Sequence, residues 1–238
     1  MTSHISLEQI DRSGALRELA DEAGALDSNG TRREMLRRTG IAGAGFVAGG
    51  VLFNGMLSPA QAAGITFSTK KKSVANDAKI ANYALTLEYL EAAFYKAAVD
   101  GGAITDPDAL DFAKTVAAHE AAHVAALKKA LGKAAVKSPT FDFGAAVTDQ
   151  ATFLKTAATV EPVGVSAYAG AGPYIKELPI LKAALAIHSV EANHAAWVTA
   201  LLKYKFGGTD SPAPNSFNPE RSEKAVLKIV TSTGFIKG

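Results

Sequence analysis

Cysteine is absent from the 238 residues of this chain, and its absence removes several kinds of site at once. Thiolate zinc sites, iron–sulfur clusters and disulfide bridges all need cysteine, whereas a cysteine-free chain is compatible with an oxidising compartment. An excess of charge of one sign is also lacking, because 25 basic and 23 acidic residues leave a formal net charge of +2. The lysines are scattered along the chain, so a nucleic-acid-binding face is not expected.

Long runs of valine, isoleucine and threonine are missing as well, while alanine is abundant, and this composition favours helices over strands. Hydrophobic residues make up 48% of the chain, which is enough for one good core. Apolar residues at spacings of three and four, bounded by glycine and proline, predict four helices. These helices are expected at residues 76–100, 107–131, 148–168 and 178–204.

The connection between the second and third of these helices, residues 133–147, is long for a tight hairpin and suits a crossover along the bundle. Residues 207–238 are rich in proline and serine and contain one short amphipathic segment, at residues 222–230. The expected fold is therefore all-α. It is an antiparallel four-helix bundle over residues 76–206, with a crossover linker and a short C-terminal helical tail, residues 207–238, packed on the bundle.

The first 62 residues have the pattern of an export signal rather than of a folded domain. A long polar leader precedes an arginine pair at residues 32–33, an apolar run follows at residues 41–57, and an A-x-A cleavage site lies at residues 60–62. This pattern resembles a twin-arginine signal, which implies the twin-arginine machinery as a partner and a location in the periplasm, the cell envelope or outside the cell. Residues 63–75 would form a linker. The alternative is that the apolar run, which is marginal in length for a bilayer of about 30 Å, is kept as an anchor.

Two short stretches in the predicted helices carry the same motif, Glu-x-x-His. Glu120 precedes His123, and Glu191 precedes His194. Residues three apart on a helix lie about 60° apart around its axis, so both side chains of each pair can point into the same core. One such pair is weak evidence for a site, because a chain of this length often contains one by chance.

The segments upstream of the two motifs make the pattern specific. Glu88 lies 32 residues before the first motif, and Glu161 lies 30 residues before the second. A tyrosine follows each single glutamate seven residues later, Tyr95 and Tyr168, which is two helical turns on and on the same face. The order Glu, Tyr, Glu-x-x-His therefore occurs twice, which indicates an internal repeat of two helical hairpins. Four glutamates and two histidines on four helices form the ligand set of a dinuclear carboxylate site.

Electrostatics gives a reason to expect metal ions at such a site. Four carboxylates that converge in an apolar core cannot all stay ionised, because one like-charge contact at about 4 Å is unfavourable by on the order of 4 kcal/mol at an effective dielectric near ~20. Burial adds several kcal/mol for each uncompensated ion. The carboxylates must take up protons or hold cations, and two divalent ions would balance all four charges. Oxygen and imidazole ligands without thiolate favour iron or manganese.

Several of these segments resemble the ferritin-like superfamily. The stretch from Asn82 to Tyr95 is similar to its first helix, and the two Glu-x-x-His stretches are similar to its second and fourth helices. Residues 164–168 and the linker segment at residues 139–144 resemble its exported, desiccation-related branch. The resemblance covers residues 76–206. It implies two iron ions, with manganese as the alternative, which react with oxygen or peroxide in the superfamily's ferroxidases, peroxidases and catalases.

Carried over position by position, the resemblance implies one set of metal ligands: Glu88, Glu120, His123, Glu161, Glu191 and His194. Glu120 and either Glu161 or Glu191 are the candidate bridges between two ions, and that choice stays open. Tyr95 and Tyr168 are candidate catalytic residues that donate to ligand carboxylates, or else plain core aromatics. A homo-oligomer is compatible with the resemblance. An iron-storage cage is not, since the linker and tail do not look like those of a cage ferritin.

Neighbouring residues complicate that assignment. Glu91, three residues after Glu88, could replace or join it as a ligand. His119 and His188 have no counterpart in the other repeat, and each is expected to be a core or surface histidine bonded to a backbone carbonyl. Pro162 lacks an amide hydrogen, so it is expected to kink or interrupt the third helix.

Two other functions compete with an exported dimetal protein that has an oxidative-stress or iron-oxidising role. The stretch from His119 to His123 also matches H-E-x-x-H, the zinc metalloprotease helix. That interpretation needs a third ligand downstream and leaves the repeat unexplained. A ferritin-like bundle kept as a metal-free structural or stress-protective protein is the stronger competitor.

Overall fold

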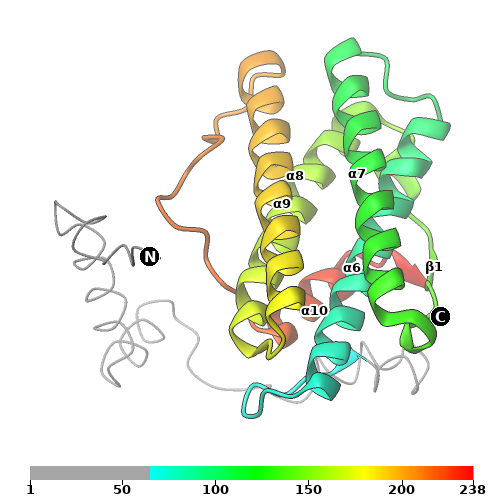
Figure 1. The fold of residues 1–238 in the computed structure, drawn as a ribbon. Helices are drawn as coiled ribbons and strands as arrows, with labels where there is room; N and C mark the ends of the chain where they lie inside the picture. The colour runs from blue at the N-terminus through cyan, green and yellow to red at the C-terminus, as the bar shows by residue number, and fades with distance from the viewer. Residues whose placement is uncertain (1–64, 238) are drawn as a thin grey trace, which may run out of the picture. The chain divides into compact units, whose positions relative to one another are not determined.

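Four long helices dominate residues 65–237, the part of the chain that the computed structural model describes (Figure 1). They are α6 (Val74–Asp100), α7 (Pro107–Leu131), α8 (Gln150–Ala171) and α9 (Leu178–Lys205). The predicted export signal, residues 1–62, lies outside the described residues and stays a prediction. Within residues 65–237, no helix is both long and apolar enough to span a bilayer.

Acidic and hydroxyl side chains cap the N-termini of three of these helices. Ser73 caps α6, Asp106 caps α7 and Asp149 caps α8, each by accepting a backbone N–H of the first turn. Such caps accept hydrogen bonds from backbone N–H groups that the first turn of a helix leaves unpaired. Each cap typically stabilises a protein by about 1 kcal/mol. The start of α9 is held from outside, because the carboxylate of Asp77 on α6 accepts two 2.9 Å hydrogen bonds from the two amides that precede α9. Helices α6 and α9 therefore begin at the same end of the bundle.

The helices form two hairpins, α6 with α7 and α8 with α9, which pack together through α6 with α8 and α7 with α9. The starts of α7 and α8 lie side by side, because the side chain of Gln150 accepts hydrogen bonds from the backbone of Thr105 and Asp106. Each helix therefore runs antiparallel to the neighbours it packs on. The predicted all-α, antiparallel four-helix bundle with a crossover is confirmed.

The crossover and the C-terminal tail meet beside the bundle. The crossover contains the 3-10 turn η1 (Gly132–Ala134), the strand β1 (Thr140–Phe141) and the 3-10 turn η2 (Gly144–Val147). The tail contains the helix α10 (Glu223–Ser232), which packs on α8, and the strand β2 (Ile236–Lys237), which pairs antiparallel with β1. The composition did not predict this small sheet, whose strands are only two residues long.

The core differs between the two ends of the bundle. At the end where α7 and α8 begin, aromatic rings fill the space between the helices. Phe94, Tyr95, Phe112 and Phe153 are all buried there, in a chain of ring contacts with centroids 5.1–6.5 Å apart. At the end where α6 and α9 begin, alanines take many of the inward positions and a hollow remains.

Pro162 lies inside α8, but the helix continues through it rather than being interrupted as predicted. A proline removes one helical hydrogen bond, so this stretch needs support from outside the helix. The guanidinium of Arg221 does not replace the lost bond, whose acceptor would be the carbonyl of Ala158, but it ties this stretch of α8 to the C-terminal tail. It lies 2.8 Å from the hydroxyl of Ser166 and 3.3 Å from the carbonyl oxygen of Pro162. Gly170 permits the approach, since a Cβ there would meet the carbonyl oxygen of Arg221 at 1.9 Å.

Candidate metal centre

The six predicted ligands meet at mid-height in the bundle, where the two hairpins face each other. Glu88 lies on α6, Glu120 and His123 on α7, Glu161 on α8, and Glu191 and His194 on α9. Five of the six are at most 2% exposed, and the side chain of His123 is 11% exposed. Acidic or imidazole side chains from all four helices therefore point into one buried region, as the repeat in the sequence predicts.

Two sets of side chains lie close enough for each to hold one ion. The first set is Glu88, Glu120, His123 and Glu191, and the second is Glu120, Glu161, Glu191 and His194. Within each set, one candidate ligand atom per residue lies within 4.8 Å of all the others. Glu120 and Glu191 belong to both sets. Of the two carboxylates between which the sequence left the choice open, Glu191 belongs to both sets and Glu161 belongs to one.

The Nδ1 atom of each histidine faces several carboxylates. In the first set, Nδ1 of His123 lies 3.1 Å from Glu88, 3.2 Å from Glu120 and 3.3 Å from Glu191. In the second set, Nδ1 of His194 lies 3.1 Å from Glu120 and 3.3 Å from a carboxylate oxygen of α8. Imidazole and carboxylate atoms that converge in this way surround a common point, as the ligands of a metal ion do.

Several of these inward atoms make no hydrogen bond of good geometry with another described residue, although imidazole and carboxylate atoms lie at ion-pair distance from each other. They are Oε1 of Glu120, Oε2 of Glu161, both carboxylate oxygens of Glu191 and Nδ1 of His194. A buried polar atom without a partner is unfavourable by about 1–3 kcal/mol, so a cluster of them needs an explanation. Two cations among these atoms would satisfy all of them. The residues present therefore fit a dimetal centre.

The tyrosines of the repeat bind the single glutamates across the two hairpins. The hydroxyl of Tyr168 on α8 donates a 2.5 Å hydrogen bond to Oε1 of Glu88 on α6. In the reverse direction, the hydroxyl of Tyr95 on α6 donates to Oε1 of Glu161 on α8. Each bond occupies one carboxylate oxygen and leaves the other to face the cluster. The two tyrosines thus hold candidate ligands in place, in addition to their role as core aromatics.

Glu91 is buried beside the cluster but belongs to neither set of candidate ligands. Its carboxylate lies next to α8, where a Cβ on Gly164 would come within 3.4 Å of Oε1. The same Cβ would come within 2.7 Å of Oε2 of Glu191. Glycine at position 164 therefore makes room for the shared carboxylate, a role that the sequence alone did not reveal.

Burial raises the pKa of most of these carboxyl groups. It is the largest cause for Glu88 and Glu91, whose pKa values lie well above the usual range, and for Glu161, whose pKa is raised less. Burial and repulsion from nearby carboxylates raise the pKa of Glu191 to about 8. Burial opposes ionisation of Glu120 too, but hydrogen bonds with the two imidazoles outweigh it and lower its pKa to about 2.

The imidazoles respond in the opposite way. Burial lowers the pKa of His123 and His194, but hydrogen bonds to the surrounding carboxylates outweigh burial and raise the two values to about 12 and about 10. At neutral pH the cluster therefore offsets its negative charge with protons on both imidazoles and on several carboxyl groups. Metal ions would supply the same positive charge and displace those protons.

His119 and His188 differ from what the sequence led us to expect. Nδ1 of His119 lies 2.8 Å from Nε2 of His194, with the two rings stacked, so its partner is the imidazole of a candidate ligand and not a backbone carbonyl. The Nδ1 atom of His188 is buried without a partner among the described residues. His119 belongs to neither set of candidate ligands. The pairing of His119 with His123 that a zinc protease requires is therefore not present in this part of the chain.

Comparison with known proteins agrees with this geometry. A family model described as a ferritin-like domain matches residues 76–204, which is more than half of the chain. No curated protein matches the chain. The matched residues contain all four long helices of the bundle except their outermost turns, and all six residues of the two ligand sets. The chain belongs to the family of ferritin-like domain proteins.

Proposed function

We propose that this protein binds two iron ions, with manganese as the alternative, and that the resulting centre reacts with oxygen or peroxide. The observation that carries the proposal is the pair of overlapping ligand sets, several of whose buried inward atoms make no hydrogen bond of good geometry. Oxygen and imidazole ligands without thiolate are typical of iron and manganese sites. A role in iron oxidation or in defence against oxidative stress follows from this chemistry.

Each residue of the cluster has a distinct part in the proposed centre. Glu120 and Glu191, which belong to both sets, would be shared by the two ions. Glu88 and His123 would help to hold one ion, and Glu161 and His194 would help to hold the other. The tyrosine hydroxyls orient the two terminal carboxylates, and His119 fixes the ring of His194 so that its Nδ1 faces inward. When bound, such a metal pair would pass electrons to oxygen or peroxide, which would be reduced while ferrous iron is oxidised.

Metal content tests the proposal directly. Full-length protein produced with iron or manganese in the medium is analysed by inductively coupled plasma mass spectrometry, beside Glu120→Ala and His194→Ala variants. We expect about two ions per wild-type chain and near zero in both variants. The control is His188→Ala, which removes a histidine of the same helix outside the ligand sets and should leave two ions bound. Wild-type protein that contains neither metal, and whose melting temperature is unchanged by EDTA, would establish the metal-free structural function instead.

The reaction is identified by three assays on the metal-loaded protein. Oxygen consumption on addition of ferrous iron would indicate iron oxidation, and removal of hydrogen peroxide would indicate peroxidase or catalase activity. Zinc in place of iron, together with cleavage of casein, would establish the protease function. We expect one of the first two activities, and we expect its loss in Glu120→Ala.

We propose in addition that residues 1–62 direct export by the twin-arginine route. This route suits a protein that folds and loads metal before it leaves the cytoplasm, and the arginine pair at residues 32–33 supports it. Replacement of both arginines by lysine should keep the protein in the cytoplasm at full length. Unchanged export of that variant would show that another route is used, without bearing on the metal centre.

A further inference from the structure

A pocket of about 340 Å³ lies among all four long helices, at the end of the bundle opposite the aromatic cluster. This volume falls in the range of small-molecule sites in proteins. The pocket exists because of small side chains: alanines at positions such as Ala81, Ala84, Ala130 and Ala171 line it, where the other end of the bundle has phenylalanine and tyrosine. An apolar hollow of this size inside a bundle is unusual, because protein interiors are normally packed without voids.

The pocket has a closed floor and an open mouth. Its floor consists of buried residues of α6 and α8, among them Ala84 and Tyr168. Its mouth lies between α7 and α9, where the lining residues Ala130 and Ala183 are exposed. A molecule that entered between α7 and α9 would therefore reach the centre of the bundle.

The inner end of the pocket adjoins the carboxylate cluster. Tyr168 lines the pocket and donates its hydroxyl hydrogen to Glu88. Ile187 lines it one helical turn before Glu191. One layer of side chains therefore separates the pocket from two of the candidate metal ligands.

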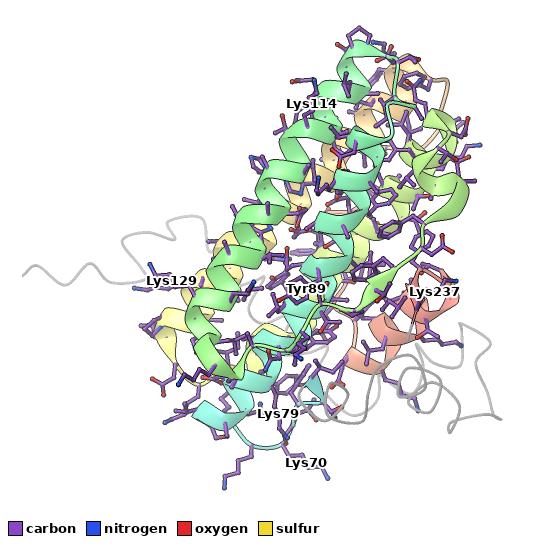
Figure 2. All side chains as sticks on the ribbon, turned by 90° about the vertical axis from the view of Figure 1, so that its right-hand side faces the viewer. Lys70, Lys79, Tyr89, Lys114, Lys129 and Lys237 are labelled. Atoms are coloured by element: carbon purple, nitrogen blue, oxygen red, sulfur yellow. The ribbon has the colours of Figure 1, made fainter. Side chains whose placement is uncertain are left out.

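Three exposed lysines lie near the rim of the pocket, whose lining contains one acidic residue, the buried Asp77. Lys129 on α7 and Lys182 on α9 each lie three residues after a lining residue of the same helix, so each is its neighbour on the surface. Lys133 lies in the turn η1, two residues after the lining residue Leu131. All three are exposed, and none forms an ion pair with another described residue. Figure 2 shows Lys129 toward the same end as Lys70 and Lys79, while Lys114 lies toward the opposite end. An apolar pocket with a cationic rim is complementary to a molecule with an apolar chain and an anionic head.

We propose that this pocket binds an unbranched fatty acid, with its chain among the alanines and its carboxylate at the lysines of the rim. The volume accommodates about ten methylene groups if each takes roughly the ~30 Å³ that a water molecule takes in the liquid. The chain end would lie against Tyr168, beside the cluster. Binding of the chain requires only the pocket, so this proposal stands independently of the metal centre.

Isothermal titration calorimetry of full-length, metal-free protein with dodecanoate, below its micellar concentration, tests the proposal. We expect saturable binding with one molecule per chain. Ala183→Phe and Ala130→Phe, which place a ring in the mouth, should weaken binding at least ten-fold. The matched controls are Ala186→Phe and Ala125→Phe, which add the same ring at exposed positions of the same helices outside the lining. Absence of saturable binding, or equal loss in blocked and control variants, would overturn the proposal.

The role of the rim is tested by comparison of dodecanoate with dodecanol. A Lys129→Gln, Lys182→Gln double variant should bind dodecanoate about five-fold more weakly at low salt and bind dodecanol unchanged. The control is Lys114→Gln with Lys155→Gln, which removes two charges near the starts of α7 and α8. Equal losses for acid and alcohol would show that the lysines do not hold the head group and would overturn that part of the proposal.

The position of the chain end is measured with dodecanoate labelled with ¹³C at its methyl carbon. In protein loaded with Mn²⁺, we expect the methyl signal to broaden much more than that of a carboxyl-labelled sample. Broadening of the two signals to the same degree would overturn the proposed orientation. Manganese that fails to bind while dodecanoate still does would count against the metal centre and leave the pocket proposal intact.

Discussion

The hydroxyl of Tyr168 on α8 hydrogen-bonds the carboxylate of Glu88 on α6, so a side chain of one hairpin holds a candidate metal ligand of the other. The reciprocal bond from Tyr95 to Glu161 repeats this arrangement. Both tyrosines have pKa values raised well above the usual range by burial, so both stay protonated donors. The repeat therefore joins the two hairpins through their ligands as well as through their apolar faces.

Replacement of these tyrosines by phenylalanine tests whether they orient the carboxylates. Tyr168→Phe removes only the hydroxyl, so the carboxylate of Glu88 loses its hydrogen-bond donor while the fold is kept. We expect the affinity of the protein for one of the two metal ions to fall about 10- to 100-fold. Tyr95→Phe should have the same effect because of the repeat. Competition with a metal-binding dye measures both affinities, and Tyr83→Phe, a buried tyrosine outside the cluster, is the control. Unchanged affinity in both variants would show that the tyrosines are core aromatics only.

Much of this arrangement could be predicted from the sequence. The helices follow from the spacing of apolar residues, and the six converging side chains follow from the repeated order Glu, Tyr, Glu-x-x-His. The first pattern lies within a single helix and the second recurs at a fixed offset along the chain, so both can be recognised in a single sequence. The equal spacing of seven in the two halves indicated that both tyrosines lie on the ligand face, but it did not indicate that each tyrosine bonds the glutamate of the other hairpin.

Other features depend on contacts between helices, and the sequence carried no signal for them. The membership of Glu191 in both ligand sets, and of Glu161 in only one, depends on where the four helices place their side chains. The contact of His119 with His194 joins α7 to α9, and neither residue's neighbours indicate it. The hollow beside Tyr168 reflects the alignment of alanines from four helices, which appears only when the helices are assembled.

Glu91 provides a test of which buried acids bind metal. Glu91→Gln keeps the shape of a carboxyl group that burial already holds protonated, so we expect two ions per chain and an unchanged or slightly higher melting temperature. Glu120→Gln should instead lose both ions, since Glu120 belongs to both sets. Mass spectrometry of the native proteins counts the ions. Loss of one ion from Glu91→Gln would make Glu91 a ligand.

Metal affinity should depend steeply on pH. His194, with a pKa of about 10, and Glu191, with a pKa of about 8, are both protonated at pH 7 without metal. Because each must lose its proton to bind, apparent affinity should rise as pH increases from about 6 toward 8, and binding should release protons. Calorimetry in buffers of different ionisation enthalpy measures the number released. Fewer than one proton per chain would contradict the protonated cluster.

A second pH effect is expected at the contact of α10 with the segment that precedes α6. Burial raises the pKa of Glu223 to about 7, and its carboxylate accepts a hydrogen bond from the amide of Phe67. Since the folded pKa exceeds that of the unfolded chain, ionisation of Glu223 destabilises the fold as pH rises from about 4.5 through 7. Glu223→Gln should therefore stabilise the protein at pH 8 by about 1 kcal/mol, a figure discounted for partial exposure, and have little effect at pH 4.5. Chemical denaturation at the two pH values measures the difference, and equal effects at both would contradict it.

Substitution of Gly164 by alanine should separate the stability of the bundle from metal binding. Alanine is favoured over glycine within a helix by about 1 kcal/mol, so on propensity alone Gly164→Ala should stabilise α8. The new Cβ would meet Oε2 of Glu191 at 2.7 Å, which is closer than such atoms approach, but a glutamate side chain can turn away. We therefore expect the metal-free variant to melt at the same or a higher temperature.

The displaced carboxylate of Glu191 would then no longer reach both ions, so the same Gly164→Ala variant should lose at least ten-fold in metal affinity. Gly172→Ala is the matched control, because its Cβ would have no neighbour closer than 4.0 Å. A fall in metal-free stability without a change in affinity would show that Glu191 is fixed by the fold and not by a metal ion. Lower affinity with unchanged stability would show the opposite: the glycine is kept at this position because the shared carboxylate needs the space to bind metal.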